Sequence, residues 1–70
     1  MTWKIRNEIK KYLQGVKFNV RNRGIWYEII IEYPTKTIDD AKNSLNLRDM
    51  LYEKMYDFEV ENGVSLSITI

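Results

Sequence analysis

Few side chains in this sequence could support catalysis. It contains no histidine and no cysteine, so the usual zinc ligands and the usual nucleophile–base pairs are missing. Asp39 and Asp40 are adjacent, but adjacent side chains on a helix point about 100° apart. That arrangement suits helix capping and compensation of the helix dipole better than a two-carboxylate site. We therefore expect a non-enzymatic protein with no catalytic residues.

Glutamates provide the one potential metal site. Glu28 and Glu32 share a face of a predicted strand, and Glu59 and Glu61 are predicted at a sheet edge. Together they could hold magnesium, although a solvated sheet face is the simpler explanation. The three glycines punctuate element boundaries and form no phosphate-binding loop. We expect no metal, no cofactor and no small-molecule substrate.

Basic side chains are concentrated in the N-terminal half. Residues 1–36 contain eight basic and three acidic residues, a net charge of +5, whereas residues 37–70 contain three and seven, a net charge of −4. A basic helix face with an aromatic residue could follow a phosphate backbone. However, the whole chain has a net charge of only +1, far from a strongly basic footprint. As an alternative function, nucleic-acid binding would use Lys4, Arg6, Lys10, Lys11, Lys17, Arg21 and Arg23.

Tryptophans predicted to lie outside the core favour protein binding. Trp3 falls off the apolar stripe of the first helix, and Trp26 and Ile30 are predicted on the sheet face opposite the core. Tryptophan and arginine are enriched at binding hot spots, and an open edge at residues 16–21 could add a strand from a partner or a second copy. We expect an interaction protein that binds or inhibits a partner macromolecule or associates with itself. The candidate partner-binding residues are Trp3, Lys10, Lys11, Arg21, Trp26 and Ile30.

Length and composition indicate a single α+β domain over residues 1–70. Seventy residues, 44% of them hydrophobic, bury only about 60% of the surface of the unfolded chain, which favours association. No apolar run has the length of a signal peptide core or a membrane span, so we expect a cytoplasmic protein that does not contact membranes. Isoleucine, lysine, asparagine and tyrosine are abundant, which is typical of AT-rich genes and favours a phage or other mobile element as the source.

The N-terminal half predicts a helix followed by a β-hairpin. Apolar residues at helical spacing follow Thr2, a suitable N-cap, and Gly15 is a suitable stop. Alternating residues then predict strands at 16–21 and 25–33. A register with Arg21 opposite Trp26 and Phe18 opposite Ile29 places the apolar side chains on one face.

The C-terminal half predicts a second helix and a second hairpin. Thr37 and Asp40 form a capping box before Ile38. On this helix, one apolar stripe (Ile38, Ala41 and Leu45) is rotated by roughly 100° or more from a second (Leu47, Met50 and Leu51). This rotation predicts a kink or break near residues 44–47. Residues 58–70 predict a hairpin with a three-residue loop at 61–63.

The predicted order is α-β-β-α-β-β. It favours a two-layer sandwich of a four-stranded, mostly antiparallel sheet with two helices on one face, a circularly permuted ferredoxin-like arrangement. A mixed sheet in simple order is the alternative. The order also resembles the bacterial-type KH domain, whose helices are joined by a Gly-x-x-Gly loop. The corresponding stretch, 42–47, contains no glycine, so we infer no KH function.

Overall fold

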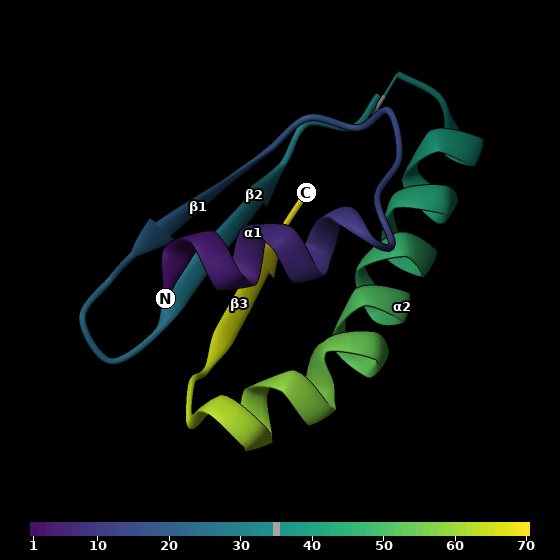
Figure 1. Cartoon of the computed structure of the whole chain (residues 1–70). Coiled ribbons are helices and arrows are strands. Elements are labelled where there is room, and N and C mark those ends of the chain that lie inside the picture. Colours follow the sequence, from purple (N-terminus) through teal and green to yellow (C-terminus); the bar gives the residue numbers. More distant parts are fainter. Residues whose placement is uncertain (35) are drawn as a thin grey trace.

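Two helices and three strands form in residues 1–34 and 36–70, which are the residues that the computed structural model describes. In chain order they are α1 (Thr2–Lys10), β1 (Phe18–Asn22), β2 (Tyr27–Ile31), α2 (Ile38–Asn62) and β3 (Leu66–Thr69) (Figure 1). The strands form one sheet in the order β1-β2-β3. β1 and β2 pair antiparallel, and β2 and β3 pair parallel.

The predicted four-stranded sheet and α-β-β-α-β-β order are wrong, because residues 58–62 are helical. Helical spacing continues through Leu51, Met55 and Phe58, all buried or half-buried. Gly63 then ends the helix in the left-handed conformation, with a φ of 63°. An Asn-Gly pair suits both a hairpin loop and a helix C-terminus, and here it serves the helix. α2 is therefore the crossover that parallel strands require, and the alternative of a mixed sheet in simple order describes the three strands.

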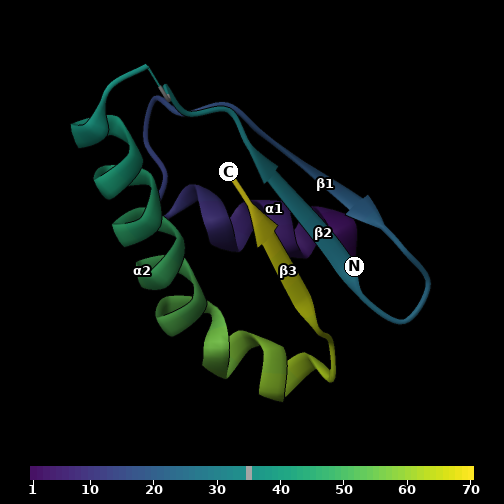
Figure 2. The ribbon, with the colours of Figure 1, turned by 180° about the vertical axis from the view of Figure 1, so that it is seen from behind.

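The predicted kink or break near residues 44–47 is also wrong, because α2 is continuous from Ile38 to Asn62. The two rotated stripes have a different explanation. Leu51 is fully buried, whereas Ile38 is 78% exposed and Leu45 is 50% exposed. One stripe packs on the core and the other faces outward. Because only one stripe is buried, the helix does not need to change direction between them. In Figures 1 and 2, the first part of α2 is nearly straight, and its C-terminal part bends toward the start of β3.

The β1–β2 hairpin is present, but the predicted register is wrong by two residues. Phe18 pairs with Ile31 and Arg21 pairs with Glu28. A shift of two residues leaves every side chain on its predicted face, so the facial pattern alone could not separate the two registers. The loop is displaced by one residue, to 23–26, and within it the backbone N–H of Arg23 donates to the Trp26 carbonyl at 2.9 Å. Trp26 consequently lies in the loop and not opposite Arg21.

Both helices begin close to their predicted starts. The N-cap of α1 is Met1 and not Thr2, a difference of one residue. The capping box of α2 is confirmed: the Thr37 hydroxyl accepts from the Asp40 backbone N–H at 3.0 Å, and the Asp40 carboxylate accepts from the Thr37 backbone N–H at 3.2 Å.

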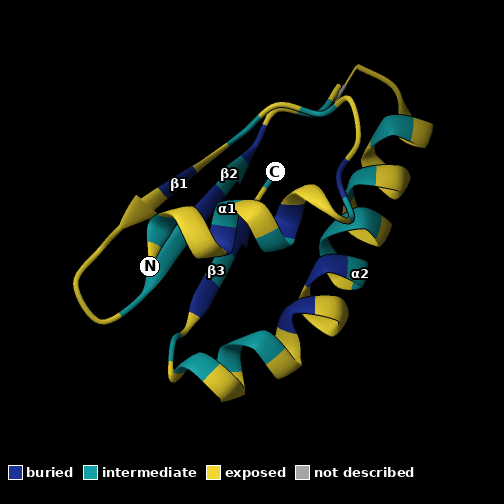
Figure 3. Cartoon of the chain, in the orientation of Figure 1, coloured by how far each residue is buried: buried dark blue, intermediate teal, exposed yellow. Residues whose placement is uncertain are grey.

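The core lies between α1, one face of the sheet and the inner side of α2 (Figure 3). α1 contributes Ile5, Ile9 and Leu13, and α2 contributes Leu51 and Met55. The strands complete the core with Val20, Ile29, Ile31, Leu66 and Ile68. Among the described residues, neither helix packs on the other face of the sheet, which is toward the viewer in Figure 2.

α2 lies along the outer edge of β3, whereas the prediction placed both helices over one sheet face. The Tyr52 hydroxyl accepts a hydrogen bond from the Ile68 backbone N–H at 2.9 Å. An edge strand otherwise leaves such groups unpaired, so α2 protects the β3 edge. β1 forms the opposite edge of the sheet, as predicted. Within the described residues, neither helix combines the length and apolarity needed to cross a membrane.

Candidate functional site

The outer side of α2 carries an exposed apolar stripe that runs almost the length of the helix. Its residues recur at intervals of three, four or seven positions, so they fall within about 100° of one another. Tyr56 and Val60 are each 64% exposed. The centre of the stripe is turned by roughly 105° from the buried side of the helix, which carries Leu51 and Met55. We call this surface the outer stripe; it consists of Ile38, Ala41, Leu45, Tyr52, Tyr56 and Val60.

An acidic row borders the outer stripe. Asp49, Glu53 and Asp57 follow one another at four-residue intervals, and all three are exposed. Asp49 has one cationic neighbour, Arg48, at 3.8 Å, which is a weak contact between exposed groups. Residues four apart lie on the same side of a helix, so the three carboxylates act as one strip of negative charge beside exposed aromatic rings.

Tyr52 connects the outer stripe to the edge of β3 through its hydrogen bond to Ile68. Two turns further along, Glu59 is half-buried against the same edge. Burial raises the pKa of the Glu59 carboxyl above its usual value, and the nearby Leu66 backbone N–H opposes that shift. The outer stripe is thus continuous with a strand edge at which α2 engages the Ile68 and Leu66 backbone N–H groups.

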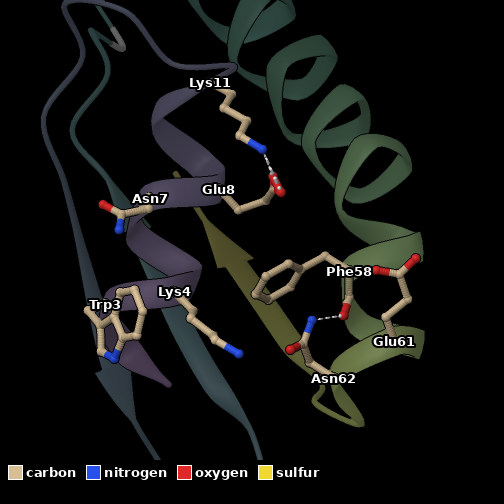
Figure 4. A pocket seen from close by; sticks show the side chains of 8 residues that line it. All are labelled: Trp3, Lys4, Asn7, Glu8, Lys11, Phe58, Glu61 and Asn62. Atoms are coloured by element: carbon tan, nitrogen blue, oxygen red, sulfur yellow. Dashed lines mark hydrogen bonds and ion pairs between the residues drawn. The ribbon is translucent and has the colours of Figure 1, made fainter.

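A groove of about 340 Å³ separates α1 from the C-terminal part of α2 (Figure 4). Trp3 stands at one side of it with 64% of its surface exposed. Lys11 and Glu8 form an ion pair within the groove, with N–O distances of 2.9 and 3.2 Å, and this contact raises the pKa of Lys11. The Glu8 Oε2 atom is buried; Lys11 Nζ is its close partner, although not in hydrogen-bond geometry. The groove is lined by Trp3, Lys4, Asn7, Glu8, Lys11, Phe58, Glu61 and Asn62.

The structure divides the predicted partner-binding residues between separate surfaces. Trp3 and Lys11 line the groove, and Lys10 is exposed beside them on α1. Arg21 and Ile30 lie on β1 and β2, paired with Glu28 and Asn19 respectively. Trp26 is half-buried in the hairpin loop. The three α1 residues thus form one cluster. Arg21, Trp26 and Ile30 do not form a second cluster, because Trp26 lies in the loop and the other two lie on the strands.

The basic residues proposed for nucleic-acid binding are partly engaged in other contacts. The Arg6 guanidinium lies 5.6 Å from the centre of the Phe18 ring, within cation–π range. Arg23 forms an ion pair with Glu28 at 2.9 Å, and Lys11 pairs with Glu8. The other four, Lys4, Lys10, Lys17 and Arg21, are exposed but are divided between α1 and the hairpin region.

The four glutamates of the hypothetical magnesium site do not share a sheet edge. Glu59 and Glu61 belong to α2, and Glu28 is paired with Arg23. In the part of the chain that the structure describes, no three acidic side chains are grouped so that they could hold a metal ion.

Sequence reasoning missed the outer stripe because it explained the stripe of Ile38, Ala41 and Leu45 by a kink or break in the helix and did not treat it as an exposed face. The signal was nevertheless present: the same helical phase continues through Tyr52, Tyr56 and beyond. Comparison with protein-family models, with curated proteins and with solved structures finds no match to this chain. The class of protein must therefore be argued from its surfaces, which are those of a small α+β domain with an exposed apolar helix face.

Proposed function

We propose that this chain is a small, non-enzymatic cytoplasmic protein that binds a protein partner, either another protein that it inhibits or a second copy of itself. The observation that carries the proposal is the outer stripe of α2. Large exposed apolar patches on soluble domains mark interaction sites. Here the stripe includes two tyrosines, a residue type enriched at binding hot spots.

The size of the domain strengthens this argument. A chain of 70 residues has little apolar surface available for its core. Five large apolar residues of α2 are nevertheless at least 38% exposed, in addition to Trp3 on α1. Burying them against a partner would supply hydrophobic free energy that the isolated fold does not use.

Nucleic-acid binding is the weaker alternative. Sequence-independent binding depends on many basic groups along one surface. Three of the seven candidates, Arg6, Lys11 and Arg23, already contact groups within the chain. In addition, the longest exposed face, that of α2, is bordered by acidic residues, which repel phosphates.

Native mass spectrometry of the tagged chain, isolated from cells that express it naturally, tests the proposal. We expect the chain to be recovered in a stoichiometric complex with protein, and Tyr56→Ser to lose that complex while retaining the helical circular dichroism signal. Asn19→Ser, on exposed β1, is the matched control and should retain it. Recovery with nucleic acid alone, together with salt-sensitive binding of purified DNA or RNA, would contradict the proposal.

A further inference from the structure

The two unusual faces of this molecule have complementary chemistry. α1 presents Trp3, Asn7 and Lys10 at four- and three-residue intervals, all exposed, and Lys4 and Lys11 lie beside them. The exposed face of α1 therefore combines three lysines, Lys4, Lys10 and Lys11, with one large aromatic side chain, Trp3. The outer side of α2 has the opposite character, because its apolar stripe is bordered by Asp49, Glu53 and Asp57.

We propose that the outer stripe of α2 binds the exposed face of α1 of a second copy of this chain. This proposal rests on the protein-binding function proposed above and names the partner. The α1 face would place Trp3 against the tyrosines of the stripe and Lys10 against the acidic row. Electrostatic complementarity of this kind directs encounter and orientation.

The dimensions of the two faces agree. α1 has nine residues, as does the segment 52–60 of α2. At 1.5 Å per residue, each extends about 13.5 Å. This segment also contains the two exposed tyrosines and lies beside Glu53 and Asp57. The C-terminal part of the outer stripe is therefore the part that one α1 helix would cover.

The two faces point in different directions, so the contact is head-to-tail. Phe58 and Asn62 line the groove against α1 of their own chain. Tyr56 and Val60 are turned by more than 100° from them around α2. A copy whose α2 is occupied thus still presents its own α1 face, and repetition of the contact gives a short open chain or a ring.

Charge disfavours the symmetric alternative in which two α2 helices pack on each other. Residues 38–62 contain seven acidic and three basic side chains, so two such helices would bring like charges together. The contact between α1 and α2 brings opposite charges together, and it should weaken as salt screens them.

Sedimentation velocity of the full chain tests this proposal. We expect the average mass to rise with protein concentration at low salt and to fall at high salt. Lys10→Glu and Glu53→Lys should each weaken self-association by about tenfold or more, the change that corresponds to about 1.4 kcal/mol. An equimolar mixture of the two variants should restore association, because each reversed charge then meets its opposite.

Matched controls keep the outcome specific. Lys17→Glu and Glu32→Lys make the same charge changes at exposed positions in the hairpin region, and they should leave self-association within about twofold of the unmodified chain. Circular dichroism establishes that every variant is folded. A chain that stays monomeric at all concentrations in low salt overturns the proposal, as does association that neither variant weakens. If the monomeric chain still captures a different protein through Tyr56, only the second-copy proposal fails and the proposed function stands.

Discussion

Two leucines on the same helix test directly which side of α2 belongs to the core. Leu51 is fully buried, and Leu45 is 50% exposed. Replacing each with alanine removes the same atoms from the same type of secondary structure, and alanine is the best helix former. The difference between the two variants therefore reports burial and not helix propensity.

The structure sets the expected magnitudes. A buried Leu→Ala substitution costs about 2–5 kcal/mol of unfolding free energy, which is comparable with the whole stability of a domain of this size. Complete burial of a leucine side chain is worth about 1.5–3 kcal/mol. Half-exposed Leu45 should therefore lose about 1 kcal/mol or less. We expect Leu51→Ala to be largely unfolded at room temperature and Leu45→Ala to stay folded.

Urea denaturation followed by circular dichroism at low protein concentration measures both changes. Low concentration keeps any contact between copies from contributing to the result. Equal losses in the two variants, or a greater loss in Leu45→Ala, would refute the orientation of α2 and with it the assignment of the outer stripe as exposed.

Three further predictions concern the ends and the edge of the fold. Tyr52→Phe removes the acceptor of the Ile68 backbone N–H and should cost about 0.5–1.5 kcal/mol, with faster hydrogen exchange at Ile68; unchanged exchange would contradict the edge contact. Thr37→Ala removes the side-chain cap of α2 and should lower the unfolding free energy by about 1 kcal/mol in a urea titration, whereas Thr2→Ala should have a smaller effect because Met1 is the N-cap of α1. Burial raises the pKa of Glu59, so folding favours its protonated form. The stability of the unmodified chain relative to Glu59→Gln should therefore rise as pH falls through the raised pKa. The increase should level off below 4.5, the ordinary pKa of this group. A relative stability that falls over this pH range would show that the pKa shift has the opposite sign.

Local signals in the sequence predicted the first three elements and the start of α2. The apolar alternation of Phe18 and Val20 against Ile29 and Ile31 identified the hairpin and its buried face, and the Thr37–Asp40 pair identified the start of the second helix. The register was wrong because a shift of two residues preserves the facial pattern. The sequence carries no comparable local signal that separates a loop closed by Arg21 and Trp26 from one closed by Arg23 and Trp26.

The larger error concerned the C-terminal half, where two residue patterns conflict. Residues 58–70 contain an Asn-Gly pair between apolar residues, which favours a hairpin. The helical phase of Leu51, Met55 and Phe58 favours continuation of the helix, and tertiary packing of Met55 in the core makes that choice. Local propensity could not reveal this, because the decision depends on which face of α2 the sheet and α1 bury.

The candidate site was predicted only in part for the same reason. Trp3 was correctly predicted to be exposed, and the structure places it beside Lys11 at a groove. The outer stripe was missed because the rotation between the stripe of Ile38 and Leu45 and the second stripe was interpreted as a kink. A core face and a binding face have the same apolar spacing, and only the packed structure separates them.

The central claim is that the outer side of α2 is a protein-binding surface, and a photo-crosslinking amino acid in place of Tyr56 tests it most directly. Irradiation of cells that express the chain should give a discrete protein adduct at position 56, and the same probe in place of exposed Asn19 should give little. If the partner is a second copy, peptide mapping should locate the crosslink on α1. No adduct at position 56, or equal adducts at both positions, would contradict the claim.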